Sequence, residues 1–273
     1  MFPPRSSIQT AMEKTFVEMN GIYVRTNNVP DDIVRFCKPL CFYNPGSEFE
    51  LSIVGTCFLA RYRQKLVLVT TRHQLGKGNA TRPPNEACIL VEEGGHHHAL
   101  TCSAYARPTF PDHADHRVAE DIILLRFDPD AHRVNPHRLF FDMTRMSTLD
   151  EVNKGVVALY FAVGYPTEFR ELKGTLDDPD AMSFEGYVSR FSKLYLETNR
   201  RESMPAHMEF RTRSDHWLTI ENLDGLSGSP VFFLYQDDTQ QFRLGYAGMI
   251  RLAANGIFHV YEGRYIRQMM DTL

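Results

Sequence analysis

Near its C-terminal end the chain reads Asp224-Gly225-Leu226-Ser227-Gly228-Ser229-Pro230, followed by the apolar run Val231-Phe232-Phe233-Leu234. A serine with glycines close on both sides, just ahead of a proline and a strand-like run, suits a nucleophile on a tight loop. Glycine lets the backbone bend sharply and brings amide groups close to a reacting carbonyl. Small-residue turns are common, so this loop alone is weak evidence for a nucleophilic serine. Two segments farther upstream supply the rest of the evidence.

These two segments place a histidine and an aspartate at the ends of apolar strands. The runs Gly55 to Tyr62 and Lys65 to His73 are joined by Arg63-Gln64, a pattern typical of a β-hairpin. Asp121 stands directly before the apolar run Ile122 to Phe127. The order along the chain is therefore histidine, aspartate, serine.

Together the three segments resemble the motifs of the trypsin-like (chymotrypsin-fold) serine peptidases. Thr70-Thr71-Arg72-His73 is similar to the histidine motif, Asp121-Ile122-Ile123-Leu124-Leu125 to the aspartate motif, and Gly225 to Pro230 to the serine motif. Val163-Gly164-Tyr165-Pro166 resembles the opening of the second barrel in bacterial members. Asn255 to His259, leading into Tyr265 to Gln268, resembles the last strand and closing helix. The likeness covers most of the chain.

The resemblance implies an all-β fold of two six-stranded antiparallel β-barrels. The short apolar runs spaced by Gly, Pro, Asp and Asn suit such barrels, and no long stretch of helical periodicity competes with them. We expect an N-terminal extension (1–45), a first barrel (46–127), an inter-barrel linker (128–154), a second barrel (155–262) and a C-terminal helix (263–273). Within the extension, Ile8 to Met19 is predicted to form a short amphipathic helix.

The same resemblance assigns a catalytic role to each motif. His73 is the general base that takes the hydroxyl proton of Ser227, and Asp121 orients the imidazole. The backbone amides of Gly225 and Ser227 form the oxyanion hole. Nearby rivals for the carboxylate role are Asp112, Asp115 and Glu120.

The substrate pocket is predicted from the resemblance alone. It should be lined by the residues just before Ser227 and by the segments around 248–251 and 256–258. We expect the substrate-binding residues to be Glu221, Met249, Ile250, Arg251 and Gly256. Glu221 in the pocket favours a basic substrate side chain, whereas Arg251 on its wall favours an acidic or small one, and Glu221 can equally be a solvated loop residue.

The chain departs from secreted members of the family at two positions. Leu226 stands where an acid would pair with a new N-terminus, so we expect no zymogen switch of that kind. Gln74 follows His73, where secreted relatives carry a disulfide. The five cysteines are odd in number and the N-terminus lacks a secretory pattern, which predicts reduced thiols in a cytoplasmic protein.

Composition restricts the partners. A net charge of −4 gives no case for a nucleic-acid surface, and no apolar run is long enough to cross a membrane. The expected partner is a protein or peptide substrate, with residues 1–45 as a possible contact for a regulatory protein. We expect no cofactor and no metal.

Two alternatives to a peptidase remain. One is a catalytically silent binding module on the same fold. The other is a metal site built from His96-His97-His98 with His113 and His116. Adjacent histidines in a strand point to opposite faces, so three in a row do not readily share one ion. Two polar loops are the simpler interpretation of the histidines.

Overall fold

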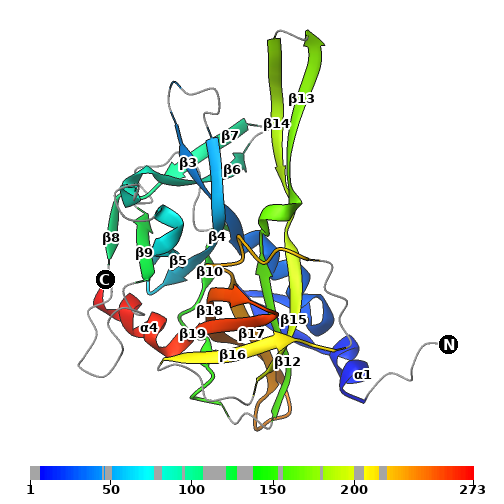
Figure 1. Ribbon diagram of the computed structural model, residues 1–273. Coiled ribbons are helices and arrows are strands. Elements are labelled where there is room, and N and C mark those ends of the chain that lie inside the picture. The colour runs from blue at the N-terminus through cyan, green and yellow to red at the C-terminus, as the bar shows by residue number, and fades with distance from the viewer. Residues whose placement is uncertain are drawn as a thin grey trace, which may run out of the picture.

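The structure is a computed structural model that is mostly β (Figure 1). It describes residues 7–44, 46, 51–76, 82–93, 96–106, 121–127, 138–152, 156–178, 181–199, 206–214 and 220–273. Two large sheets dominate, and the expected all-β class is confirmed.

The first half of the chain forms an eight-stranded sheet in the order β7-β6-β3-β4-β5-β9-β8, with β10 paired to β4. Its strands are β3 (Cys37–Tyr43), β4 (Leu51–Tyr62), β5 (Lys65–Thr71), β6 (Ala87–Glu93), β7 (His96–Thr101), β8 (Ala104–Ala106), β9 (Ile122–Phe127) and β10 (Phe141–Asp142). The hairpin expected at Arg63-Gln64 is confirmed: both residues have positive φ, 48° and 74°, as a two-residue turn requires.

The second half forms a closed barrel. Six antiparallel strands make the ring β18-β17-β12-β15-β16-β19, because β19 pairs back onto β18. They are β12 (Val157–Gly164), β15 (Ser192–Thr198), β16 (His207–Thr212), β17 (Pro230–Gln236), β18 (Phe242–Ala254) and β19 (Ile257–Glu262). β11 (Ser147–Thr148) adds a parallel pairing to β18. The second barrel is therefore as expected.

The described residues of the first half do not show the closed barrel that was expected there. Within the described residues, β7 pairs with β6 and β8 pairs with β9, and no ladder joins these two ends of the sheet. β8 spans only Ala104–Ala106, which leaves little backbone for a further ladder. The first half is a curled, open sheet in place of a second full barrel.

The N-terminal segment differs in two ways from the sequence expectation. The helix α1 (Ser7–Lys14) ends early, because Phe16–Met19 alternates exposed and buried side chains and pairs as β1 with β2 (Ile22–Arg25). After α2 (Val29–Asp32), β3 already belongs to the first sheet, although residues up to 45 were expected to precede it. His96–Thr101 is also strand β7, so the first histidine cluster does not lie in a loop.

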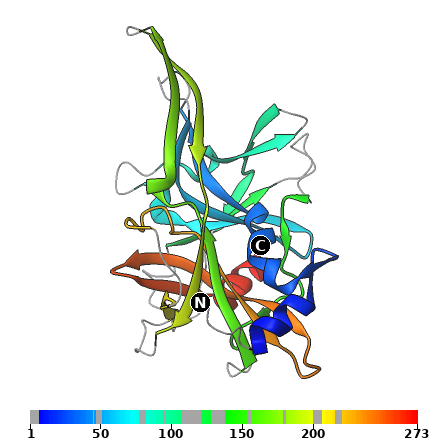
Figure 2. The ribbon, with the colours of Figure 1, turned by 90° about the vertical axis from the view of Figure 1, so that its right-hand side faces the viewer.

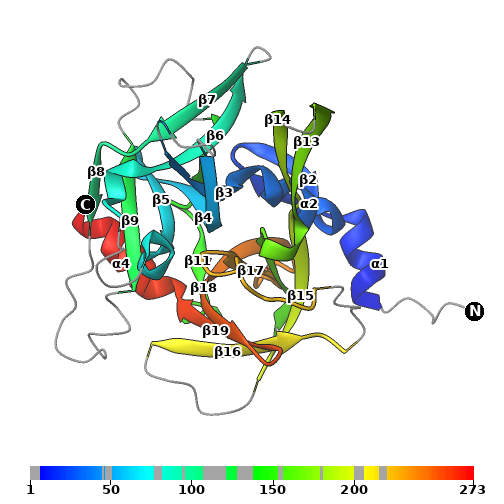
Figure 3. The ribbon, with the colours of Figure 1, turned by 45° about the horizontal axis from the view of Figure 1, so that its top comes forward.

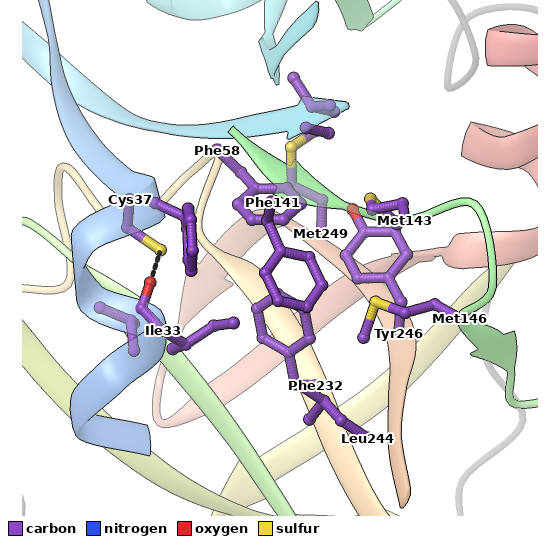
Figure 4. Packing of buried hydrophobic residues seen from close by; sticks show 14 of the residues in the cluster. Ile33, Cys37, Phe58, Phe141, Met143, Met146, Phe232, Leu244, Tyr246 and Met249 are labelled. Carbon is purple, nitrogen blue, oxygen red and sulfur yellow. Dashed lines mark hydrogen bonds between the residues drawn. The ribbon is translucent and has the colours of Figure 1, made fainter. Parts of the chain in front are cut away.

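The two sheets share one apolar core. Phe58 of β4 and Phe232 of β17 meet edge to face with ring centroids 5.4 Å apart, and Phe141 and Tyr246 pack beside them (Figure 4). All four side chains are buried. Each half also has its own smaller cluster on the far side of its sheet. Since the shared cluster draws on both halves, packing joins them into one unit.

Two further elements complete the fold. The hairpin of β13 (Arg170–Asp178) and β14 (Ala181–Ser189) extends away from both sheets (Figures 1 and 2). The helix α4 (Gly263–Thr272) packs against β18 and β19 and agrees with the expected C-terminal helix. Among the helices described, none combines the length and apolar character needed to span a bilayer.

Candidate active site

His73 follows β5 and Asp121 precedes β9. These two strands lie side by side (Figure 3), and the two side chains are in contact. Thr71 and Ile122 are paired in the ladder, so the residues just beyond them lie at the same edge of the sheet. The 3-10 turn Arg72–Leu75 begins directly after β5 and carries His73. The Arg72 backbone N–H donates to the Asp121 carbonyl at 2.5 Å, which fixes this corner.

The Asp121 carboxylate accepts two hydrogen bonds from His73. The His73 backbone N–H donates to Asp121 Oδ1 at 3.0 Å, and the ring Nδ1 lies 2.9 Å from Oδ2. Because a carboxylate only accepts hydrogen bonds, Nδ1 carries a proton, and in the neutral imidazole Nε2 then keeps its lone pair. Nε2 lies 3.5 Å from Thr71 Oγ1 and remains able to accept a proton. This tautomer is the one that a general base needs.

Ser227 lies on the loop that leads into β17, between two glycines with positive φ. Gly225 has φ +88° and Gly228 has φ +85°, a region that favours glycine. The Ser227 hydroxyl donates to the Arg251 carbonyl at 3.0 Å. Across the described residues, no hydrogen bond joins Ser227 to His73. The structure therefore pairs two of the three predicted catalytic residues and turns the hydroxyl of the third toward β18.

The serine loop nevertheless lies against the turn that carries His73. The Ser227 carbonyl accepts hydrogen bonds from the Thr56 backbone N–H at 3.3 Å and from Nε2 of Gln74, the residue after His73. Thr56 Oγ1 also donates to the Gly225 carbonyl at 2.7 Å. Contacts between the open sheet and the loop thus hold Ser227 beside the histidine–aspartate pair. Sequence analysis assigned no role to Thr56 or Gln74.

The two backbone amides predicted to form the oxyanion hole make no hydrogen bond to any described residue. In the part of the chain that the structure describes, the backbone N–H groups of Gly225 and Ser227 have no acceptor, while their neighbours Leu226 and Gly228 donate to Leu223 and Ile250 carbonyls. Gly225 and Ser227 are both half-buried. The backbone N–H groups of Gly225 and Ser227, at and just before the candidate nucleophile, are suited to bind an anionic oxygen.

Arg251 lies beside Asp121. Its Nη1 is 3.7 Å from Asp121 Oδ2, and the two side chains are 18% and 15% exposed. Arg251 therefore contributes its backbone to Ser227 and its charge to Asp121, whereas sequence analysis expected it on the pocket wall.

The other predicted substrate-binding residues are spread over different surroundings. Glu221 is exposed, and its backbone N–H donates to the Glu168 carboxylate at 3.0 Å. Met249 and Ile250 are fully buried in core clusters, and the Ile250 backbone N–H and carbonyl are hydrogen-bonded to Ser229 and Gly228, so neither residue is accessible to a ligand in this structure. Gly256 is exposed in the turn before β19, with φ +74°.

A groove of about 620 Å³ lies between the β1–β2 hairpin and the segment around β10 and β11. Glu18, Arg61, Arg145 and Arg243 line it, and none of the candidate catalytic residues does. Within the described ranges, no group of three or more His, Cys, Asp and Glu residues is arranged to hold a metal ion. The histidines His113 and His116, and the rival carboxylates Asp112, Asp115 and Glu120, lie outside the described residues.

No protein-family model matches the chain, and no curated protein is significantly similar to it.

Proposed function

We propose that the chain is a serine endopeptidase of trypsin-like type that hydrolyses peptide bonds through His73, Asp121 and Ser227. The main support is the hydrogen-bonded pair of His73 and Asp121, which leaves Nε2 available as a base beside a glycine-flanked serine loop. A metal or cofactor has no role in this chemistry.

In the proposed reaction the Ser227 hydroxyl turns from the Arg251 carbonyl toward His73. Nε2 takes the hydroxyl proton while Oγ bonds to the carbonyl carbon of the substrate, and the imidazolium then gives that proton to the leaving amine. The acyl-enzyme is hydrolysed when Nε2 removes a proton from water and returns it to Oγ. Asp121 stabilises the imidazolium in both stages.

The amides of Gly225 and Ser227 bind the oxygen that becomes negative in each tetrahedral intermediate. They carry no other hydrogen bond among the described residues, so they are free to do so. In comparable enzymes one such donor contributes about 3 kcal/mol to the transition state.

The site also supports proposals about activation and location. Leu226 is completely buried within the barrel core, where an ion pair to a new N-terminus has no place, so we propose activity without that cleavage. All five cysteines are buried and unbridged, in keeping with a reducing, cytoplasmic setting. A regulatory protein would find Phe16, Ile22 and Tyr23 exposed on the β1–β2 hairpin.

One observation favours the alternative of a silent binding module. The Ser227 hydroxyl donates to Arg251 and not to His73, so the three side chains are not linked in this structure. The two functions differ in whether Ser227 can be acylated.

Reaction with a fluorophosphonate probe, in which Oγ bonds to phosphorus and fluoride leaves, decides between them. The full chain with an intact Met1 is incubated with the probe, and the modified residue is located by mass spectrometry. We expect stoichiometric modification of Ser227 and none in Ser227→Ala. A folded wild-type chain that stays unmodified would exclude the peptidase and leave the binding module.

A further inference from the structure

The side chain of Gln74 connects the histidine turn to the serine loop. Gln74 is 8% exposed, and its Nε2 donates to the Ser227 carbonyl. A backbone carbonyl can only accept, so the amide nitrogen is the end of Gln74 that faces Ser227. One side chain, directly after the candidate base, thus bonds the backbone of the candidate nucleophile.

The other end of the amide is held from within the open sheet. Gln74 Oε1 lies 2.9 Å from Thr70 Oγ1, which is also 3.0 Å from the Thr56 carbonyl. The hydroxyl proton of Thr70 therefore lies between two acceptors. Thr56 in turn donates its own N–H to the Ser227 carbonyl, so the network closes on the same oxygen that Gln74 binds. Thr56 and Thr70 are completely buried, which strengthens these bonds.

The fold leaves space for this amide at Gly55. A Cβ on Gly55 would lie 2.5 Å from both Cδ and Nε2 of Gln74. The φ of Gly55 is not in the left-handed region, so a side chain at this position is opposed by the Gln74 amide and not by backbone conformation. Gly55 thus leaves room for the Gln74 amide, and Thr70 binds its oxygen.

We propose that Gln74 is a positioning residue that sets the Ser227 loop against His73. This inference rests on the proposed peptidase function. A residue that only filled space would need no hydrogen bond to Ser227, whereas a tether to the nucleophile's own carbonyl controls how far Oγ lies from Nε2. A misplacement of about 1 Å can lower a rate about 100-fold.

The test compares Gln74→Leu with a matched control, Asn199→Leu. Leucine removes the amide donor in both variants, and Asn199 donates its bond at 3.0 Å to the Glu209 carboxylate, on β16 and away from the site. We measure the second-order rate constant for phosphonylation by the fluorophosphonate probe, and kcat and KM for a small ester whose hydrolysis passes through the acyl-enzyme. Gln74→Leu should lower phosphonylation and kcat about 10- to 100-fold with KM nearly unchanged, and Asn199→Leu should leave all three within about twofold. A folded Gln74→Leu variant that reacts at the wild-type rate overturns the proposal.

Gly55→Ala provides a second arm, because its methyl group would displace the Gln74 amide. It should slow phosphonylation as Gln74→Leu does. In a Gln74→Ala background it should cost no further rate, since the clashing amide is gone, so the two changes are non-additive. Additive losses would overturn the tether.

Hydrogen exchange separates this inference from the proposed function. If the wild-type chain is not phosphonylated, the peptidase proposal fails, yet the tether can still be judged from peptides covering 223–230. These amides should exchange about tenfold faster in Gln74→Leu than in the wild type and in Asn199→Leu. Unchanged exchange in the loop overturns the tether whatever the labelling shows.

Discussion

The open sheet and the closed barrel supply the candidate site in different ways. The open sheet supplies His73 and Asp121 from the ends of two paired strands, so the ladder between β5 and β9 sets their distance. The barrel supplies Ser227 from a loop whose shape depends on two glycines with positive φ. The pair is therefore built by local sheet pairing, whereas the serine is placed by contacts between the halves. Changes in the two regions should damage the site in different ways.

Asp121→Asn tests the open-sheet contribution and should have the largest effect. An amide at this position can donate to Nδ1 and so stabilise the tautomer in which Nε2 is protonated. We expect phosphonylation of Ser227 to fall about 10⁴-fold, with the fold retained because one side-chain oxygen still accepts the His73 backbone N–H. The measurement is the rate of reaction of Ser227 with the fluorophosphonate probe over the neutral pH range.

Asp142→Asn is the matched control for this change. Asp142 lies in β10 and pairs with Arg61 at 2.8 Å, outside the candidate site. Phosphonylation of this variant should equal that of the wild type. A loss in Asp121→Asn of less than tenfold would show that the pair on the open sheet is not the base of the reaction.

Phe232→Ala tests whether the two regions fold as one unit. Phe232 is completely buried in the shared core, with Phe58 from the open sheet and Phe161 from the barrel 5.4 and 5.7 Å away. Its truncation should lower the free energy of unfolding by about 3–5 kcal/mol, through lost burial and the cavity left behind. Denaturant unfolding followed by near-UV and far-UV circular dichroism should keep a single transition.

Phe16→Ala is the comparison, since this ring is 53% exposed on the β1–β2 hairpin. Its effect should stay within about 0.5 kcal/mol. Two separate transitions in the wild-type chain would mean that the open sheet and the barrel are independent, and that the shared core does not couple them.

The parts of the site that sequence analysis predicted are those set by strand ends. The apolar run Lys65 to Thr71 and the run Ile122 to Phe127 mark β5 and β9, so the residues that follow and precede them could be located. The direction of the Ser227 hydroxyl and the contact of Arg251 with Asp121 are side-chain rotamers chosen by neighbours distant in sequence. No local sequence pattern predicts these rotamers. Gln74 gave one local signal, its place after His73, but its partner Ser227 lies in the other half of the chain.

The same distinction applies to the fold. Ring closure of the second half was predicted and is observed, whereas the described residues of the first half show a curled sheet without a second closed ring. Whether a sheet closes depends on pairing between strands far apart in the chain, and a three-residue strand such as β8 leaves little trace in the sequence. The two-residue strands β10 and β11, each parallel to a strand of a different sheet, could not be foreseen for the same reason.

The smallest effect that we expect is a difference in thiol reactivity between the regions. All five cysteines belong to the open-sheet half, and Cys102, between β7 and β8, is the most exposed at 7%. Burial raises the pKa of Cys41 to about 12, with Cys88 adding to the shift and Arg170 opposing it. Because the thiolate is the reactive form, native Cys41 should be nearly inert at neutral pH and react faster as the pH rises. A short pulse of a thiol reagent followed by mass spectrometry should find Cys102 modified first.

A cysteine introduced into the closed barrel allows the rates of thiol modification in the two regions to be compared. Ala162 is completely buried on β12, the strand that lies between β15 and β17 in the ring, so Ala162→Cys adds a small reporter there. Local opening exposes the ends of an open sheet more readily than the interior of a closed ring. The introduced thiol should therefore react about tenfold more slowly than Cys102, in a variant whose unfolding midpoint matches the wild type. Equal rates would mean that the closed barrel opens locally as readily as the open sheet. The barrel that carries Ser227 would then be no more rigid than the sheet that carries His73 and Asp121.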